Sequence, residues 1–308
     1  MNTNRECVQS DLWANWLLRE RFAGDPAHER AFRADISRYA DRVLDGARLE
    51  AGMTLVDVGA GDGLVAFRAI DRIGPSLHTV LVDISAALLQ HAEATATQCG
   101  IRGQCTFTQC SAEALEGIGD ASVDAVTTRA VLAYLPDKRA VLREFYRVVK
   151  PGGRISIAEP ICRDDALDVV ALKKSVDALP AGTDDHISRL LYRWKITHLP
   201  GTEEDIAANP ITNYSERDLV RYAMDAGFTD IHMEFHIDVG PSPTTSWDVL
   251  LKNPPFPWAP PLGELLRNTF TKDEGKRIEQ ALRPLLTSGQ QSFSIRTAFL
   301  SATKPLAS

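Results

Sequence analysis

One short stretch constrains the fold of this chain more than any other: residues 55–64 read L-V-D-V-G-A-G-D-G-L. A run typical of a buried strand leads directly into three glycines spaced two apart, and an apolar helical pattern follows from Leu64 to Ile73. Glycine accepts positive φ and, lacking a Cβ, lets a ligand approach the backbone closely. The helix that follows points free N–H groups at whatever lies above the turn. The stretch therefore predicts a strand, a tight turn and a helix that together form a cofactor site.

The glycine spacing distinguishes two classes of cofactor site. Dinucleotide-binding turns read G-x-G-x-x-G. Here Gly59, Gly61 and Gly63 give G-x-G-x-G, and Leu64 stands where the dinucleotide pattern needs its third glycine. An acidic residue, Asp57, precedes the first glycine by two positions. The spacing therefore counts against a nicotinamide dehydrogenase.

A second acidic residue follows at an informative distance. Residues 79–82 read as another buried strand, which ends in Asp83. A carboxylate about 20 residues after the glycine turn, at the tip of the next strand, can accept hydrogen bonds from both ribose hydroxyls. The alternative is an acid at the start of the helical pattern that follows. Together with the glycine turn, Asp83 favours the ribose role.

The rest of the chain alternates strands with helical patterns. Strands are predicted at about 54–58, 78–82, 104–108, 123–128, 154–159, 229–239 and 292–303. Such alternation predicts an α/β fold with a largely parallel sheet covered by helices on both faces. Ligands of such sheets bind at the carboxyl ends of the strands, where the glycine turn and Asp83 are expected to meet.

Residues 9–48 read as helical and are interrupted at 24–26 by G-D-P. Trp13, Trp16 and Leu17 begin an apolar stripe that continues at helical spacing. Packing against the core is the favoured interpretation, because aromatic stripes at this spacing are usually buried in the core. The alternative is a lid whose tryptophans cover the cofactor.

Several ordered motifs between about residues 50 and 160 carry a family resemblance. The glycine turn with its preceding acid resembles motif I of the class I S-adenosylmethionine (SAM)-dependent methyltransferases. The run R-V-V-K-P-G-G-R at 147–154 resembles a signature of those that act on small molecules. The chain is similar to the ubiquinone/menaquinone methyltransferase-like type. The resemblance implies SAM as methyl donor and a Rossmann-like seven-stranded sheet whose last strand is antiparallel. It also implies a helical cap at 1–48 and a methyltransferase domain at 49–308, with helical lid insertions at about 163–213 and 241–291.

The resemblance also implies which residues hold the cofactor. In that family the turn after the third strand usually reads G-D-A-E-x-L, and its aspartate binds the adenine amino group. Here Ser111 stands at that position, and a neutral hydroxyl is expected to bind more weakly. Arg129, at the tip of the fourth strand, is expected to face the cofactor carboxylate or the acceptor, with a surface ion pair as the alternative. The predicted cofactor residues are Asp57, Gly59, Ala60, Gly61, Gly63, Asp83, Ile84, Ser111, Ala112, Glu113 and Arg129.

Methyl transfer from a sulfonium depends mainly on alignment and on exclusion of water. A general base is needed only where the acceptor must lose a proton. The candidates for a catalytic role are Arg129, Tyr134, Glu159, His186 and His198, with His232 and His236 as further possible bases. Cations of the first insertion either hold an acidic acceptor or form a solvated helix face; they are Arg163, Arg189, Arg193 and Lys195. The proline-rich segment 253–261 is either a wall of the acceptor pocket or a rigid surface connection.

Composition excludes several other classes. A net charge of −7 without long charge runs argues against a nucleic-acid partner. No apolar run is long enough to span a membrane, and the first residues do not form a secretory signal. Five scattered cysteines favour a reduced, cytoplasmic setting, and no metal-ligand spacing is present. A homodimer remains open. The alternatives to methyl transfer are another transferase or a cyclase that uses the same pocket, and a non-catalytic SAM-binding protein.

Overall fold

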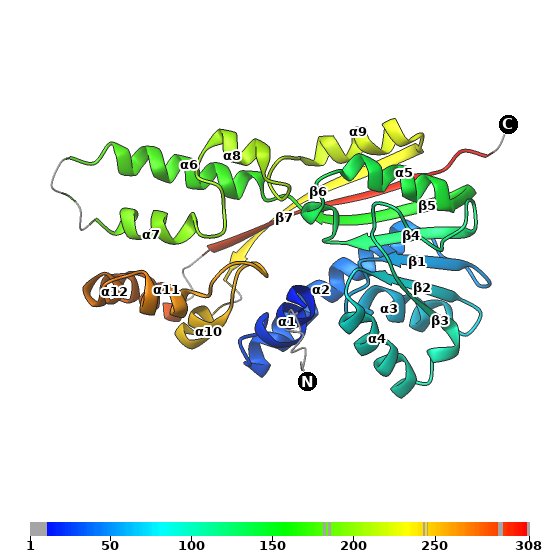
Figure 1. Ribbon diagram of the computed structural model, residues 1–308, viewed down its shortest axis with the longest axis horizontal. Coiled ribbons are helices and arrows are strands. Elements are labelled where there is room, and N and C mark those ends of the chain that lie inside the picture. Colours follow the sequence, from blue (N-terminus) through cyan, green and yellow to red (C-terminus); the bar gives the residue numbers. More distant parts are fainter. Residues whose placement is uncertain are drawn as a thin grey trace, which may run out of the picture.

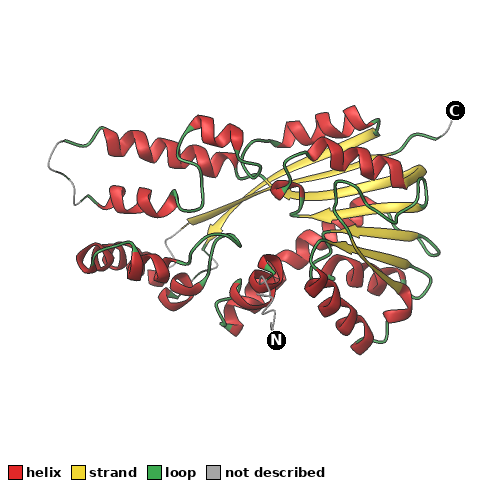
Figure 2. Cartoon of the chain, viewed as in Figure 1, coloured by secondary structure: helices red, strands yellow, loops and turns green. Residues whose placement is uncertain are grey.

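A seven-stranded β-sheet is the centre of the computed structural model of this chain, which describes residues 11–180, 183, 186–242, 244, 246–288 and 292–306 (Figures 1 and 2). The strands are β1 (Thr54–Val58), β2 (His78–Asp83), β3 (Cys105–Gln109), β4 (Val123–Arg129), β5 (Val149–Pro160), β6 (Thr229–Pro241) and β7 (Ser292–Thr303). Their order is β3-β2-β1-β4-β5-β7-β6. Only β7 is antiparallel to its neighbours. The Rossmann-like sheet with a reversed last strand is confirmed.

Helices cover both faces of this sheet. The first face packs against α2 (Pro26–Ala47), α3 (Leu64–Ile73) and α4 (Ala86–Gln98), and the second against α5 (Lys138–Val148) and α9 (Glu216–Ala226). Along β1, Leu55 joins the core of the first face, whereas Val56 and Val58 join that of the second. Since both faces are buried, the central strands are almost continuously apolar rather than alternating.

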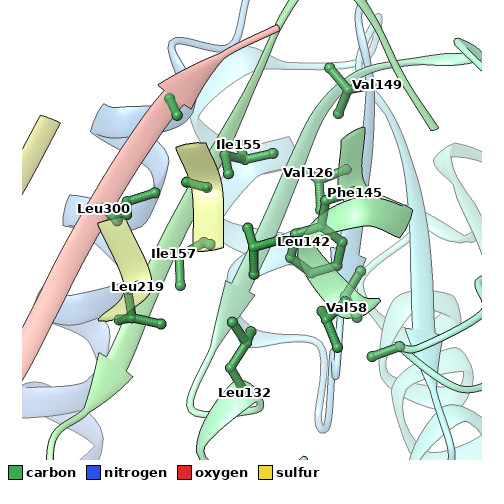
Figure 3. Packing of buried hydrophobic residues seen from close by; sticks show 14 of the residues in the cluster. Val58, Val126, Leu132, Leu142, Phe145, Val149, Ile155, Ile157, Leu219 and Leu300 are labelled. Atoms are coloured by element: carbon green, nitrogen blue, oxygen red, sulfur yellow. The ribbon is translucent and has the colours of Figure 1, made fainter. Parts of the chain in front are cut away.

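The core of the second face forms a rigid support beneath the strand tips. Leu142 and Phe145 from α5 and Leu219 from α9 pack toward Val126 of β4 and Ile157 of β5 (Figure 3). All five side chains are almost fully excluded from solvent. Large buried side chains at native packing density resist movement. The carboxyl ends of the strands are therefore held at fixed positions.

β5 begins earlier than its predicted start at residue 154. Val123 pairs with Val149 and Ala125 with Arg154, so the run K-P-G-G at 150–153 forms a bulge between two paired segments. Gly152 has φ +82°, and a Cβ on Gly153 would lie 2.6 Å from the Asp124 carbonyl oxygen. Both glycines are therefore required by the backbone, in agreement with a structural role for this signature.

The chain before the sheet forms a cap of three helical pieces: α1 (Leu12–Asn15), the π-helix η1 (Trp16–Glu20) and α2. The predicted break at 24–26 is confirmed. The Asp25 carboxylate accepts hydrogen bonds from the N–H groups of Ala27 and His28, and Pro26 is the first residue of α2. This break lets the short segment 12–23 leave the direction of α2, and we refer to it as the lid segment.

Two insertions that are distant in sequence pack as one unit. The first contains α6 (Arg163–Asp177), α7 (Ile187–Lys195) and α8 (Glu203–Ala208), and the second α10 (Trp247–Lys252), α11 (Leu262–Asn268) and α12 (Lys272–Ser288). Leu190 of α7 shares a buried cluster with Leu262 and Leu265 of α11 and with Ile278 and Leu282 of α12. Figure 1 shows both groups beside the far ends of β6 and β7. In the part of the chain that the structure describes, no helix is long and apolar enough to cross a membrane.

Candidate cofactor and acceptor sites

A cavity of about 270 Å³ lies where β1, β2 and β4 end, between the glycine turn and the lid segment. It is lined by most of the predicted cofactor residues together with one catalytic candidate: Asp57, Gly59, Ala60, Gly61, Asp83, Ile84, Ser111, Ala112, Arg129 and Tyr134. Gly63 and Glu113 are not among its lining residues. We call it the first cavity. It occupies the position at the carboxyl ends of the strands where such sheets bind ligands.

A positive φ or a close contact requires glycine at each of the three positions of the turn. A Cβ on Gly59, which has φ +67°, would come within 2.1 Å of a Val131 methyl carbon. Gly61, with φ +57°, donates its N–H to the Asp83 carboxylate at 2.9 Å and leaves its open side toward the cavity. Gly63 has φ +86° and packs against the ring of Phe67. Gly63 therefore has a structural role at the start of α3, and its cofactor contact stays a prediction.

Asp83 is held in one orientation at the tip of β2. One carboxylate oxygen accepts the N–H of Gly61 and the other that of Ser85, both at 2.9 Å. Burial raises the pKa of Asp83, and the two backbone N–H groups oppose that shift. Because each carboxylate oxygen has two lone pairs, both retain an acceptor position. The group is arranged to accept two hydrogen bonds from a diol.

Asp57 brings an unpartnered acceptor into the same cavity. The residue is 2% exposed, and its Oδ1 accepts a hydrogen bond from the Thr127 hydroxyl at 2.8 Å. Its buried Oδ2 has no hydrogen-bond partner among the described residues. Burial raises the pKa of Asp57 to about 7. A buried acceptor without a partner is costly, and it marks the place where a cationic ligand group would be stabilised.

The turn after β3 forms another wall of the cavity. The Ser111 hydroxyl oxygen accepts the N–H of Glu113 at 3.2 Å, and the Ser111 carbonyl accepts from Ala114 and Leu115. Opposite this turn, Ile84 is 63% exposed although it lines the cavity. Apolar surface left open beside polar backbone suits a flat, aromatic ligand group.

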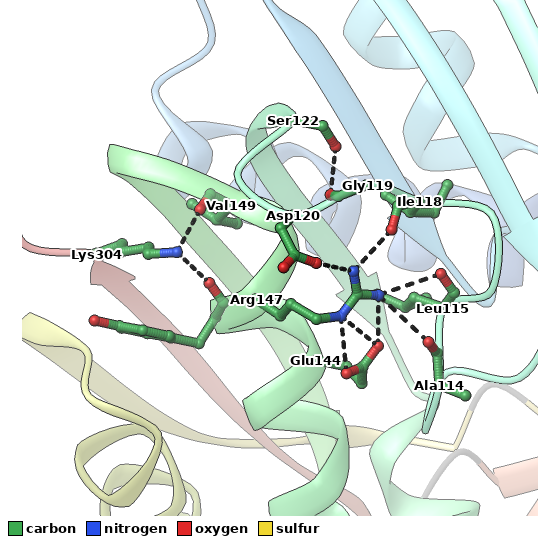
Figure 4. A network of polar contacts seen from close by, with 11 residues as sticks. Ala114, Leu115, Ile118, Gly119, Asp120, Ser122, Glu144, Arg147, Val149 and Lys304 are labelled. Carbon is green, nitrogen blue, oxygen red and sulfur yellow. Dashed lines mark hydrogen bonds and ion pairs between the residues drawn. The ribbon is translucent and has the colours of Figure 1, made fainter.

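Arg147 fixes the loop that follows this turn (Figure 4). It donates one guanidinium N–H to the Ile118 carbonyl at 2.8 Å and ion-pairs with Asp120 and Glu144 at 2.7 Å. Longer contacts reach the carbonyls of Ala114 and Leu115. The R-V-V-K-P-G-G-R signature therefore positions a cavity wall, a role that its glycines and proline alone did not indicate.

The lid segment closes the other side of the cavity. Trp13, Trp16, Leu17 and Arg21 all line it. Trp13 and Trp16 thus face the cavity rather than the buried core, contrary to the favoured interpretation, and the lid interpretation stays a prediction. Later members of the same stripe do enter the core, as Leu44 of α2 shows. Helical periodicity could not separate the two cases, because a lid and a core helix both need an apolar face.

A second cavity, of about 740 Å³, adjoins the first. Trp13 and Tyr134 line both cavities, and their rings meet edge-to-face with centroids 4.8 Å apart. Trp258 also lines it, with its centroid 6.0 Å from that of Tyr134 and its ring stacked on Phe256. The proline-rich segment thus contributes a wall of this cavity through its aromatic rings. The first insertion supplies most of the remaining lining: Ile196, Thr197, His198, Leu199, Pro200, Asp205, Ala208, Asn209, Pro210 and Ile211.

The histidine candidates differ in their positions relative to the two cavities. His198 lines the second cavity, and burial lowers its pKa to about 4, so the ring is neutral near pH 7. His186 is exposed at the start of α7, where its ring accepts the N–H of Ser188, and it lines neither cavity. His232 and His236 flank Glu234 on β6 and line neither cavity. Of these histidines, only His198 lies where an acceptor would bind.

Glu159 has a structural position rather than the catalytic one considered for it. Its carboxylate is fully buried and accepts the backbone N–H groups of Val131, Leu132 and Ala133 at 2.9–3.0 Å. These groups begin the 3₁₀ turn η3 (Leu132–Tyr134). Glu159 lines neither cavity. Its hydrogen bonds fix the turn that carries Tyr134.

Of the cations considered for an acidic acceptor, Arg129 lines the first cavity, and those of the first insertion line neither cavity; the latter are Arg163, Arg189, Arg193 and Lys195. Arg193 ion-pairs with Glu274 and lies over the ring of Phe270, which ties α7 to the second insertion. Arg189 donates to the Thr183 carbonyl. The acidic-acceptor hypothesis therefore finds no support in these side chains.

Comparisons with known proteins agree with this geometry. Residues 49–194 match the family described as a methyltransferase domain. The nocamycin O-methyltransferase of Saccharothrix syringae is 33% identical over 161 residues, which cover 49% of this chain and 56% of that protein. A ubiquinone/menaquinone biosynthesis C-methyltransferase of Brucella anthropi is 36% identical over 108 residues, 35% of this chain and 41% of that one. The matches thus span about half the length of these relatives.

Solved structures extend the likeness of fold beyond this region. The crystal structure of the YcgJ protein from Bacillus subtilis has a TM-score of 0.53 at 18% identity, and covers 88% of this chain and 99% of that one. At this identity the likeness concerns the fold.

Proposed function

We propose that the chain transfers the methyl group of SAM to a small-molecule acceptor, because residues 49–194 match the family described as a methyltransferase domain. The observation that carries the proposal is the first cavity, in which the glycine turn and the fixed Asp83 carboxylate face one ligand space. The curated relatives named above are methyltransferases of small molecules by their names, which supports the same class of reaction.

The residues of the first cavity fit SAM along its length. We assign the ribose hydroxyls to Asp83, whose two oxygens each keep an acceptor position. The exposed face of Ile84 suits the adenine ring, with Ser111 and Ala112 at its edge. The unpartnered Oδ2 of Asp57 suits the ammonium group of the methionyl end.

The proposed reaction is an in-line displacement that depends on alignment. SAM, when bound, supplies an electrophilic methyl group on a positively charged sulfur. The protein's part is to orient the acceptor and exclude water. Trp13 and Tyr134 border both cavities, so the methyl group would pass between ligands at their edges. Their π faces are suited to stabilise the neighbouring positive charge.

We assign the second cavity to the acceptor. Its lining is mainly aromatic and aliphatic, and apart from the Tyr134 phenol its ionisable side chains are His198 and Asp205. Such a cavity suits a largely apolar molecule without a strong negative charge. A neutral His198 ring can accept a hydrogen bond from an acceptor hydroxyl. A pKa of about 4 makes it a weak general base, so we assign it positioning rather than proton removal.

Calorimetric titration tests the proposal directly. The purified protein is titrated with SAM, with its demethylated product S-adenosylhomocysteine (SAH) and with NAD. We expect SAM and SAH to bind and NAD to be silent. Asp83→Ala should weaken SAH binding at least about 10-fold, because two charge-assisted hydrogen bonds are lost. Asp71→Ala, which removes an exposed carboxylate from α3, is the matched control. A wild-type protein that binds neither SAM nor SAH would contradict the proposal.

We further propose a reduced, cytoplasmic setting and no nucleic-acid partner. The described cysteines Cys99, Cys105, Cys110 and Cys162 are all free, which supports the first point, and the net charge of −7 supports the second. We also propose that the chain forms a homodimer, and light scattering on the purified protein measures its oligomeric state.

A further inference from the structure

Two guanidinium groups of the first cavity form no ion pair with another residue that the structure describes. Arg21 of the lid segment and Arg129 at the tip of β4 both line it. No ion pair or hydrogen bond from either side chain is formed within the described part of the chain. By contrast, Arg33 of the same cap is paired with Glu29 and Asp62. Unpaired arginines that share a cavity are costly unless a ligand supplies the missing charge.

Arg21 is the more constrained of the two. Its Nε is buried without a hydrogen-bond partner. Its guanidinium carbon lies 4.8 Å from the ring centre of Trp16 and 4.4 Å from that of Phe32. Burial and the nearby charge of Arg129 lower the pKa of Arg21 to about 9. Aromatic stacking thus fixes the guanidinium in place, while its hydrogen-bonding capacity stays unused.

The polar groups of the cavity complement a zwitterion. Asp57 offers a buried acceptor without a partner, and Arg21 a buried donor without a partner. Both line the same cavity. An amino-acid end group carries one ammonium and one carboxylate, and a planar guanidinium binds a carboxylate through two parallel hydrogen bonds. Of the parts of SAM, only its methionyl end has this pair of charges.

We propose that Arg21 is a further cofactor-binding residue, which binds the α-carboxylate of the methionyl group and so couples the lid segment to the bound cofactor. The inference rests on the proposed function. The η1 π-helix, directly before Arg21, supports it, because π-helical turns are frequently found at functional sites. An acidic group of the acceptor is the other possible source of a carboxylate, and the ligand comparison below distinguishes the two.

The test compares SAH with 5′-methylthioadenosine, which keeps the adenosine and sulfur but lacks the amino-acid end. Both are titrated calorimetrically into wild-type protein, Arg21→Gln, Arg21→Lys and the control Arg19→Gln. Arg19 is exposed and on the same segment, so the control makes the same change of net charge. We expect Arg21→Gln to weaken SAH about 10- to 100-fold and methylthioadenosine less than about 2-fold. The affinity of Arg21→Lys for SAH should lie between those of the wild type and Arg21→Gln, and Arg19→Gln should resemble the wild type.

The remaining outcomes each decide the matter. Equal weakening of both ligands by Arg21→Gln would show that Arg21 only supports the lid, and would overturn the inference. Unchanged SAH binding would exclude the cofactor carboxylate and overturn it as well, leaving an acidic acceptor as its ligand. Both results leave the proposed function standing, because wild-type binding is retained. Wild-type protein that binds neither ligand would overturn the proposed function and this inference together.

Discussion

Asp57 shows how one buried side chain can link stability and ligand binding. Its carboxylate accepts a hydrogen bond from Thr127, and burial raises its pKa to about 7. An acid whose folded-state pKa lies above its unfolded value stabilises the fold only while it is protonated. The stability is fully present below about pH 4 and is lost as the pH rises through about 7. The free protein therefore carries a cost at neutral pH that a cationic ligand group would offset.

Asp57→Asn should accordingly stabilise the free protein and weaken cofactor binding. The amide can still accept the Thr127 hydrogen bond but bears no charge. At pH 8 we expect the variant to gain roughly 2 kcal/mol over the wild type, with the gain shrinking as the pH falls toward 4. SAH affinity should fall at the same time. Thermal unfolding across this pH range, with calorimetry at pH 8, measures both. A variant less stable than the wild type at pH 8 would contradict the assignment.

Glu159 leads to a different expectation: burial raises its pKa as well, but three backbone N–H groups already point at its carboxylate. Its three backbone hydrogen bonds hold the turn that begins at Val131. In Glu159→Gln one oxygen becomes an NH₂ group that faces N–H donors, which should cost roughly 2 kcal/mol. We expect a lowered unfolding temperature and faster amide exchange over 131–134. Glu204→Gln, an exposed change on α8, is the control. Unchanged stability with lost methyl transfer would instead indicate a catalytic base.

The lid segment is the element on which cofactor retention should depend most. Leu17 lines the first cavity, whereas its neighbour Leu18 is 37% exposed. Leu17→Ala removes apolar surface from the cavity and should weaken SAH about 5- to 30-fold, while Leu18→Ala should have little effect. Hydrogen exchange gives a second readout, since SAH should slow exchange over 12–23 in the wild type. Equal effects of the two substitutions would show that the segment does not close on the ligand.

At the scale of the whole molecule, the chain has two cores with different tasks. The sheet with α2–α5 and α9 forms the larger one, and the two insertions share a separate cluster around Ile278. The cluster unites segments that lie about 70 residues apart or more, from α7 to α12. Because this cluster shares no residue with the cores of the sheet, we expect it to loosen while the sheet stays intact.

Ile278→Ala tests this separation. Ile278 is completely buried, so the truncation should cost about 2–4 kcal/mol within the insertions. We expect faster amide exchange over 187–195 and 262–282, with unchanged exchange in β1 and β4 and unchanged SAH affinity. Global loss of protection in the sheet would show that the two cores unfold as one unit. Leu285→Ala, an exposed change on α12, serves as the control.

The sequence predicted the sheet well because its signals are local. The glycine turn, the break at 24–26 and the strand at 54–58 each depend on neighbouring residues, and the structure confirms them. The second cavity could not be derived in this way. Trp13, Tyr134 and Trp258 come from three distant segments, and nothing in their local patterns shows that they meet.

Individual functional residues were predicted where backbone chemistry dictates them and missed where only tertiary contacts do. Asp83 follows from its place at a strand tip. Arg21 gave no signal, because an arginine at a helix end is ordinary in sequence. The role that we propose for it rests on its Nε, which has no hydrogen-bond partner among the described residues, and on the rings of Trp16 and Phe32 beside it.

The shared wall of the two cavities has a kinetic consequence. Trp13 belongs to the lid segment and also borders the acceptor space. If the lid segment moves away when the cofactor exchanges, the second cavity loses the part of its wall that Trp13 supplies. The two substrates should therefore bind in a compulsory order, with SAM first and SAH released last. SAH should then inhibit competitively against SAM and noncompetitively against the acceptor. The rate of turnover would be limited by the dissociation of SAH from beneath the lid segment.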